Sequence, residues 1–223
     1  VHLVGNLKID AIPSADASSL DERWREELRI APGRPVIVAG STHPGEDEAV
    51  LRAFVHLRGE FPELLLILAP RHPERLGAVE AAIAASNLTA ARRTRITESA
   101  EGPREVVLLD TIGELSKIYA VASAVFIGGS LVPSGGHNLL EPAALARPIL
   151  FGPHMENFAE ATALFVERGA AVQVRGAEAL APELARLLRD PSAGSRMGKA
   201  ALECLAAHRG ACDRTVALLG RYV

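Results

Sequence analysis

A repeated order along the chain constrains the fold more than any other feature. A short apolar run comes first, then a polar segment with glycine or proline, then a stretch with the apolar spacing of a helix. Such β-branched runs are typical of strands in a parallel sheet, because crossover helices cover both faces of that sheet. The expected strands are 36–40, 64–68, 106–109, 124–127, 148–151 and 171–174, with a weaker one at 93–96.

Helices are expected between these strands and towards both ends of the chain. Their predicted ranges are 20–28, 46–59, 76–86, 114–122, 156–168, 178–188 and 195–220, and one more begins at Asn138. Strands that alternate with such helices form right-handed crossovers. The predicted fold is therefore α/β, a Rossmann-like doubly wound parallel sheet with helices on both faces. We expect residues 1–30 to form an interdomain linker and first helix, and residues 31–223 to form the domain.

The composition is that of an ordinary globular protein. Of 223 residues, 48% are hydrophobic and 23% are charged, and the formal net charge of −3 gives no reason to expect nucleic acid as the main partner. No apolar run approaches the ~18 residues that span a bilayer, and no signal peptide is visible. If one helix carries Cys204 and Cys212, they lie too far apart for a disulfide, and two unpaired thiols fit a reducing compartment. The chain opens at Val1 without Met, so we expect a piece of a longer protein.

One loop carries the strongest functional signal. Residues 128–137 read GGSLVPSGGH and join an apolar strand to the helix expected from Asn138. Glycines let backbone N–H groups approach a ligand closely, and a helix N-terminus adds partial positive charge, which together suit a phosphate. The loop lacks Gly-x-x-x-x-Gly-Lys-Ser/Thr and Gly-x-Gly-x-x-Gly, so neither an ATPase nor an ordinary dinucleotide site is indicated. In the alternative interpretation the turn binds nothing, and Asn138 and Glu141 only cap the helix.

Polar segments follow the predicted strands at their carboxyl ends, where ligands bind in open α/β sheets. These segments are 41–43, 71–72, 110–114, 128–141 and 152–154. Together they bring cations, hydroxyl groups, backbone amides and a carboxylate to one edge of the sheet. The histidines show no metal-ligand spacing, and Ser134 lacks the Gly-x-Ser-x-Gly of a hydrolase nucleophile.

Each charged or histidine side chain at this edge has two interpretations. Arg71, directly after a buried strand, favours anion binding over a solvated loop position. His72, between Arg71 and Pro73, is expected to be structural or a secondary phosphate contact rather than a catalytic base. His137 donates to a phosphate or holds the loop in place. Glu114 follows Thr111 at the spacing of a capping box, which favours a structural role.

Five segments together resemble the C-terminal half of bacterial 3-deoxy-D-manno-oct-2-ulosonic acid (Kdo) transferases. In chain order they are GNLKID (5–10), GSTHPGE (40–46), PRHPER (70–75), DTIGEL (110–115), and the group GGSLV (128–132), GGHN (135–138) and EP (141–142). The resemblance covers nearly the whole chain and is weakest at 90–104 and beyond Ala177. It implies one half of a GT-B glycosyltransferase, in which two Rossmann-like domains face each other across a cleft.

For this chain the resemblance implies the domain that binds the nucleotide sugar CMP-Kdo. The implied nucleotide and phosphate contacts are Arg71, His72, Ile112, Gly113, Gly135, Gly136, His137, Asn138 and Glu141, and the implied sugar-facing residues are Ser41 and His43. Arg71 and the amides of the 135–136 turn are implied to hold the phosphate, and the 112–113 pair to line the cytosine pocket. Glu141 would accept the ribose hydroxyls, and Asn138 would touch the nucleotide or the loop.

The resemblance also implies the reaction and its setting. Kdo passes from CMP-Kdo to the lipid A precursor at the cytoplasmic face of the bacterial inner membrane, with no cofactor and no metal bound by the protein. The acidic catalytic base and the membrane anchor belong to the N-terminal half, so we expect no catalytic residue in this chain, and expect the chain alone to be soluble and inactive. Two alternatives stay open: another GT-B domain, from a UDP-sugar transferase or an epimerase, or a non-enzymatic nucleotide-binding module.

Overall fold

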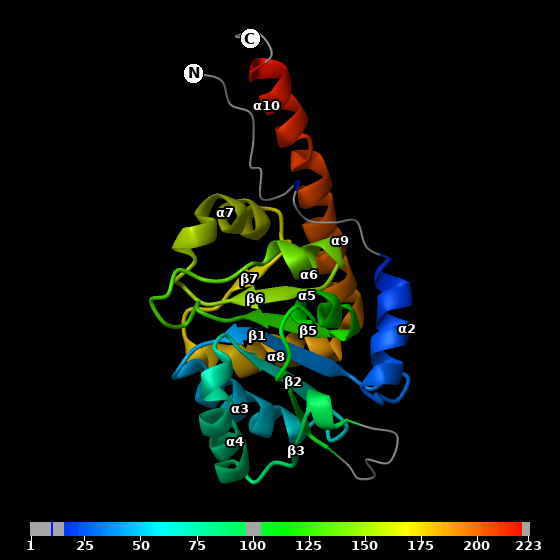
Figure 1. Ribbon diagram of the computed structural model, residues 1–223, viewed down its shortest axis with the longest axis vertical. Helices are drawn as coiled ribbons and strands as arrows, with labels where there is room; N and C mark the ends of the chain where they lie inside the picture. Colours follow the sequence, from blue (N-terminus) through cyan, green and yellow to red (C-terminus); the bar gives the residue numbers. More distant parts are fainter. Residues whose placement is uncertain (1–9, 11–15, 97–103, 220–223) are drawn as a thin grey trace.

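The computed structural model describes residue 10 and residues 16–96 and 104–219, and its centre is a seven-stranded sheet between two layers of helices (Figure 1). The strand order is β3-β4-β2-β1-β5-β6-β7, and every neighbouring pair is parallel. The strands are β1 (Val36–Thr42), β2 (Leu65–Pro70), β3 (Ala90–Arg92), β4 (Val106–Leu108), β5 (Ala124–Ile127), β6 (Ile149–Phe151) and β7 (Val172–Gln173). The predicted doubly wound Rossmann-like fold is confirmed.

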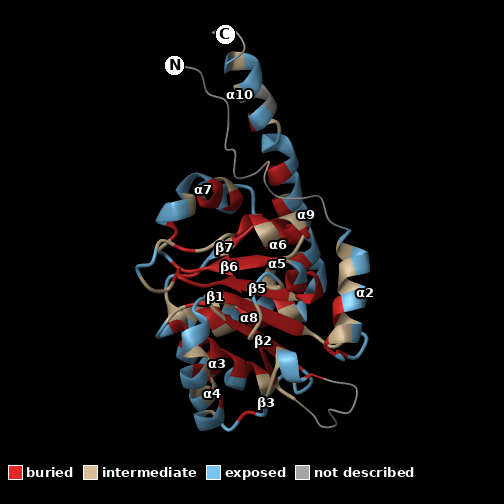
Figure 2. Cartoon of the chain, viewed as in Figure 1, coloured by how far each residue is buried: buried red, intermediate tan, exposed pale blue. Residues whose placement is uncertain are grey.

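Helices cover both faces of the sheet. The α-helices are α2 (Ala17–Glu27), α3 (Glu46–Arg58), α4 (Leu76–Ala85), α5 (Leu115–Ile118), α6 (Leu140–Ala144), α7 (Ala159–Glu167), α8 (Leu180–Arg189), α9 (Pro191–His208) and α10 (Ala211–Leu219). Short 3₁₀ helices are η1 (Pro73–Arg75), η2 (Arg93–Arg95), η3 (Tyr119–Val121), η4 (Glu156–Phe158) and η5 (Ala177–Ala179). In β1, Val36 and Val38 belong to the core under α2, α5, α6 and α9, whereas Ile37 and Ala39 belong to the core under α3, α4 and α8. This alternation explains why the inner strands β1, β2, β4, β5 and β6 are buried along nearly their whole length, whereas the edge strands β3 and β7 are partly exposed (Figure 2).

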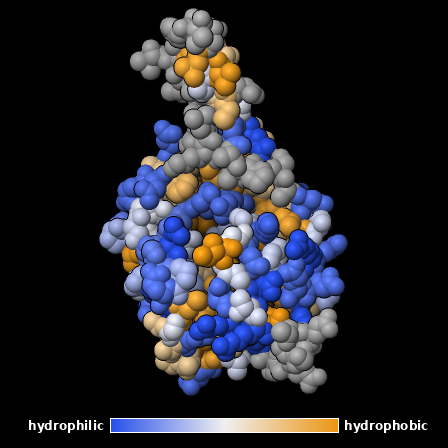
Figure 3. All heavy atoms as spheres, viewed as in Figure 1, coloured by the Kyte–Doolittle hydropathy of each residue, from blue (hydrophilic) through white to orange (hydrophobic). Residues whose placement is uncertain are grey.

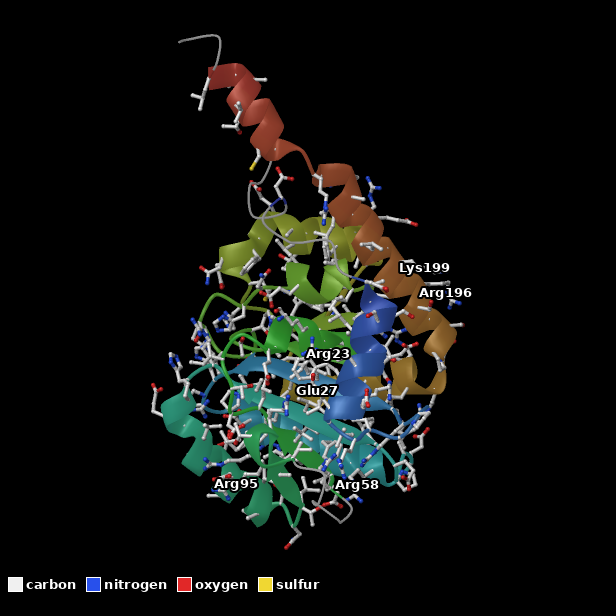
Figure 4. All side chains as sticks on the ribbon, turned by 45° about the vertical axis from the view of Figure 1, so that its right-hand side comes forward. Arg23, Glu27, Arg58, Arg95, Arg196 and Lys199 are labelled. Carbon is white, nitrogen blue, oxygen red and sulfur yellow. The ribbon has the colours of Figure 1, made fainter. Side chains whose placement is uncertain are left out.

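The first helix packs into one of these cores. Asp16 caps α2 by accepting a hydrogen bond from the Ser18 N–H (3.0 Å), and Trp24, on the inner side of the helix, is 2% exposed. Arg23 and Glu27 form an ion pair on its outer side, and Figure 4 shows them next to each other. The helix therefore belongs to the packed body, although it precedes the domain boundary expected at residue 31.

Two predicted elements differ from the structure. The weak strand expected at 93–96 is wrong: β3 lies at 90–92, where it pairs with β4, and residues 93–95 form η2. The single helix expected at 195–220 is divided into α9 and α10 at Gly210, whose φ is +88°. Asp10 stabilises the break by accepting hydrogen bonds from the backbone N–H groups of Gly210 and Cys212, both at 2.7 Å. Cys204 and Cys212 therefore lie on different helices.

Helix α10 extends from the end of α9 beyond the body of the sheet (Figure 1). Apolar atoms are visible on it in Figure 3, and Val216 and Leu219 are 69% and 59% exposed. Among the described helices, none is long and apolar enough to cross a membrane. Apart from Asp10, the GNLKID segment lies outside the described residues.

Candidate functional site

The candidate site lies at the topological switch point of the sheet, where successive strands are added on opposite sides of β1. From the central β1, the chain builds β2, β4 and β3 on one side and then β5, β6 and β7 on the other. The loops that follow β1 and β5 therefore separate and open a crevice at the carboxyl ends of the strands, where such folds bind ligands. In Figure 1 these loops project from the left-hand end of the sheet, opposite α2.

A cavity of about 130 Å³ opens at this edge, and Ser41, Arg71, Ile112 and Gly113 are among the residues that line it. All four were predicted from the sequence, and they come from the end of β1 and from the loops after β2 and β4. Ile112 is 89% exposed, so its side chain offers apolar surface to solvent rather than to the core. Gly113 turns the chain at φ +85°, a left-handed conformation that favours glycine.

Arg71 is a cation without an internal partner among the described residues. Its backbone N–H donates to the Thr42 carbonyl (3.0 Å), which ties the loop to the end of β1, while its guanidinium is exposed. Arg75, four residues on, is instead ion-paired with Asp47, which is 1% exposed and also accepts from Thr42 Oγ1 (2.6 Å). An unpaired guanidinium at a cavity wall is suited to binding an anion.

Three histidines gather beside the cavity. The Nε2 atoms of His43 and His137 lie 2.8 Å apart and their rings stack, while the His72 ring meets His43 edge-on with centroids 5.7 Å apart. Burial lowers the pKa of His137 to about 4, with help from the neighbouring His43 and Arg71, and burial also lowers the pKa of His43. Both rings are therefore neutral at pH 7. A hydrogen bond between the two Nε2 atoms needs one of them to accept, and only a neutral ring can accept.

The glycine loop is organised by Glu46, the first residue of α3, which is fully buried. Its Oε2 accepts hydrogen bonds from the N–H groups of His43 (2.9 Å) and Gly129 (2.6 Å). Its Oε1 accepts from Ser130 (2.9 Å) and Leu131 (2.8 Å). A carboxylate with four amide donors has its acceptor positions filled, so Glu46 fixes the first half of the loop against the end of β1.

The second half of the loop is the 135–136 turn, whose glycines have φ of +82° and +72°. The Gly136 N–H donates to the Gly129 carbonyl (2.9 Å), so this amide is not available to a phosphate. Gly135 keeps an N–H without a partner among the described residues. Asn157 supports the turn through its own N–H, which donates to the Gly135 carbonyl (2.9 Å).

Asn138 and Glu141 do not form the capping pair of the alternative interpretation. The helix begins at Leu140 rather than at Asn138, because Asn138 Oδ1 accepts the Leu140 N–H (3.1 Å) in a turn before the helix. Asn138 Nδ2 donates to Glu141 Oε1 (3.0 Å), so the carboxylate makes a side-chain contact and no backbone cap. Burial raises the pKa of Glu141, and burial together with the Glu141 charge raises the pKa of Tyr119.

The end of β1 packs directly against the glycine loop. The Gly128 N–H donates to the Gly40 carbonyl (2.8 Å), and a Cβ atom at position 128 would overlap the Ser41 carbonyl. Ser41 itself has φ +57°, and the β1–β2 register shifts between Gly40 and Thr42. This kinked strand end brings Ser41 to the cavity wall.

Sequence analysis missed two residues that build this site. Glu46 is an acidic residue in the first turn of a helix. Solvent-exposed acids are also common at that position, because the helix dipole stabilises their charge, so the position alone does not reveal its role. Asn157 follows a Gly-Pro-His exit segment and carries no distinctive pattern. Within the described residues, no group of three or more histidine, cysteine, aspartate or glutamate side chains is arranged to hold a metal ion.

Comparison with known proteins places this geometry in a family. No family model matches the chain. The chain is 36% identical over 228 residues to the 3-deoxy-D-manno-octulosonic acid transferase of Haemophilus influenzae, which covers 100% of this chain and 52% of that protein. The corresponding transferase of Bordetella pertussis is 36% identical over 219 residues, covering 96% and 50%. The chain thus spans about half the length of the curated relatives that it matches.

A solved structure decides the family. The crystal structure of the C-terminal CMP-Kdo binding domain of WaaA from Acinetobacter baumannii is 30% identical, with a TM-score of 0.74, and the match covers 90% of this chain and 99% of that one. The chain belongs to the Kdo transferase family. The sequence prediction of this family, and of a Rossmann-like domain of the GT-B type, is confirmed.

Proposed function

We propose that this chain is the donor-binding domain of a Kdo transferase and that its ligand is CMP-Kdo. The observation that carries the proposal is the Arg71 guanidinium, which has no partner among the described residues and lies at the wall of a cavity at the switch point of the sheet. The relationship to a domain described as CMP-Kdo binding supports the same ligand. A nucleoside monophosphate needs one cationic contact, an apolar surface for the base and acceptors for the ribose.

The phosphate contacts are assigned by charge and by free donors. Arg71 donates to the phosphate oxygens, and the Gly135 N–H adds a neutral donor. His137 and His72, which gather with His43, are assigned to the same phosphate, since a neutral imidazole keeps one N–H donor. Gly136 contributes through its left-handed conformation, since its N–H is already engaged.

The remaining contacts are assigned by polarity. The exposed Ile112 and the turn at Gly113 give the cytosine an apolar surface with open backbone. Glu141 accepts the ribose hydroxyls, and Asn138 orients its carboxylate through their hydrogen bond. Ser41 and His43, at the end of β1, face the Kdo group.

The same contacts suit the transfer step. The bond between the Kdo anomeric carbon and the phosphate oxygen breaks, its electron pair leaves with CMP, and the acceptor oxygen forms the new bond while its proton passes to a base. Negative charge therefore grows on the phosphate in the transition state. The Arg71 guanidinium and the preformed Gly135 N–H dipole stabilise that charge more than they stabilise the ground state.

The rest of the reaction is assigned to a second half of the protein. We propose that residues 31–223, with helix α2 packed on them, form the donor domain, and that residues 1–30 connect it to a domain that supplies the base and binds the lipid A precursor. That arrangement would place the whole enzyme at the cytoplasmic face of the inner membrane. It agrees with the chain's span of about half its relatives' length.

Calorimetric titration of the purified chain with CMP and with UDP tests the proposal. Tighter binding of CMP is expected, and equal or tighter binding of UDP would favour a domain that takes a UDP-sugar. No binding of either nucleotide would refute a donor-binding role. A second assay with CMP-Kdo and a lipid A precursor is expected to show no turnover, and turnover by this chain alone would contradict the assignment of the base to another half.

A further inference from the structure

The anion-binding face of the glycine loop is occupied by the protein itself. Successive N–H groups in a glycine-rich turn after a strand form a concave set of donors that suits a phosphate. Here the N–H groups of Gly129, Ser130 and Leu131 all point at the buried carboxylate of Glu46, at 2.6 to 2.9 Å. A ligand phosphate cannot use these donors while Glu46 holds them.

Glu46 also brings a negative charge that no cation neutralises among the described residues. It forms no ion pair there, and its partners are four backbone N–H groups and the N-terminal turn of α3. The adjacent Asp47 forms an ion pair with Arg75, so the Arg75 charge is not available to neutralise Glu46. Behind the loop, the site therefore holds a buried anion in place of free N–H donors.

The positive charge on the open side of the loop is small. Arg71 is the guanidinium at the cavity that lacks an ion pair in the described part of the chain, and His43 and His137 share a hydrogen bond as neutral rings. One arginine and one free amide match a single phosphate group. They leave the additional charge of a diphosphate uncompensated.

We infer that Glu46 determines donor specificity: its carboxylate fills the amide face of the glycine loop, and the site accepts a nucleoside monophosphate group while rejecting a nucleoside diphosphate. This inference rests on the proposed donor-binding function and adds the reason why one phosphate is selected. Glu46 acts on the ligand through the loop and through its charge, and makes no contact with the reacting atoms.

The test is the ratio of CDP to CMP dissociation constants, measured by calorimetry in magnesium-free buffer. The wild-type chain is expected to bind CMP about tenfold more tightly than CDP, because the second phosphate meets the Glu46 charge. Glu46→Gln and Glu46→Ala should reduce that preference by about fivefold or more, and high acetate should restore it in Glu46→Ala by refilling the amide face. Glu48→Gln is the matched control, an exposed acid two residues along the same helix, and should leave the ratio unchanged.

A ratio that stays within about twofold of wild type in both folded Glu46 variants would overturn the inference, as would a wild-type chain that prefers CDP. If neither variant folds, amide NMR of the wild type decides. CMP is then expected to shift the Gly135 resonance and to leave those of Gly129, Ser130 and Leu131 in place, and equal shifts at all four would refute the inference. A wild-type chain that binds neither nucleotide refutes the proposed function instead.

Discussion

The two edges of the sheet use their arginines differently. At the amino ends of the strands, Arg25 donates to the Val121 carbonyl and Arg147 to the Ala122 carbonyl, both at 3.4 Å. At the carboxyl ends, the Arg71 guanidinium has no partner among the described residues. Yet the amino-edge cavity, lined in part by Arg25, Arg34 and Arg147, measures about 500 Å³, against about 130 Å³ at the carboxyl edge. The proposed ligand site is therefore distinguished from the amino edge by an unpaired guanidinium, and not by its cavity volume or its number of cations.

The direction of the backbone explains this difference. Carbonyl groups at the end of η3 point to the amino edge, where cations satisfy them. N–H groups at the start of α3 and of the glycine loop point to the carboxyl edge, where anions are favoured. Arginines at the amino edge therefore stabilise the fold, whereas an arginine at the carboxyl edge stays available to bind an anion.

Acid should destabilise the protein through the carboxyl edge, and this is the largest effect expected. Because the folded protein holds the pKa of His137 near 4, against 6.5 without the fold, the unfolded chain binds more protons between these values. Stability should fall as the pH falls through that window, by up to about 3 kcal/mol from this group, and the lowered pKa of His43 acts in the same direction. Urea unfolding at pH 7 and pH 4.5 measures it.

The variant His137→Asn should remove most of that pH dependence, whatever it does to stability at pH 7. His56→Asn, on the exposed side of α3, is the matched control and should retain it. An unchanged pH slope in His137→Asn would show that the stacked histidines do not couple to folding.

Replacing one arginine on each edge with alanine should have opposite effects on CMP affinity and on melting temperature. Arg71→Ala should weaken CMP binding by roughly 1.5–3 kcal/mol, the value of a charge-assisted hydrogen bond, with little loss of cytidine binding or of melting temperature. Arg25→Ala removes the ion pair with Asp21 and the bond to the Val121 carbonyl, so it should lower the melting temperature and leave CMP affinity unchanged. Calorimetry and thermal unfolding of both variants test the pair. Equal losses for CMP and cytidine in Arg71→Ala would mean that Arg71 shapes the loop and does not meet the phosphate.

Glu141→Gln should cost CMP affinity on the order of 1–2 kcal/mol, because a neutral amide replaces charged acceptors for the ribose. The melting temperature should barely change, since Asn138 can still donate to the remaining carbonyl oxygen. Deoxy-CMP without the 2′-hydroxyl should bind the wild type more weakly and lose less on mutation. Normal CMP binding by the variant would make the carboxylate structural.

The parts of the molecule that the sequence predicted are those that local chemistry determines. Strands such as β1 and β5 are apolar runs with turns on both sides, and the parallel order follows from the helices between them. Residues 41, 71, 112 and 113 could be assigned to one edge because they directly follow such strands.

The rest depends on contacts between distant segments. The break between α9 and α10 is held by Asp10, 200 residues away from Gly210, and no helical pattern around residue 210 reveals it. Glu46 finds its partners more than 80 residues later, in the glycine loop. The helix start differs from the prediction for a local reason. The Asn138 side chain bonds the Leu140 N–H and the Glu141 carboxylate, and the helix begins at Leu140 rather than at Asn138.

Ile112→Ser should have the smallest effect and gives the sharpest test of where the base lies. The side chain is 89% exposed, so its loss should change the free energy of unfolding by less than about 0.5 kcal/mol. If cytosine covers it in the complex, the variant loses apolar burial worth on the order of 1 kcal/mol, and CMP and cytidine should weaken by the same factor. That equality is the opposite of the result expected for Arg71→Ala, where only the nucleotide with a phosphate loses affinity. Val55→Ser, an exposed apolar position on α3, is the control and should bind both normally. Should Ile112→Ser bind cytidine as tightly as the wild type, the base does not rest on residues 112–113, and the cavity beside Arg71 holds the phosphate alone.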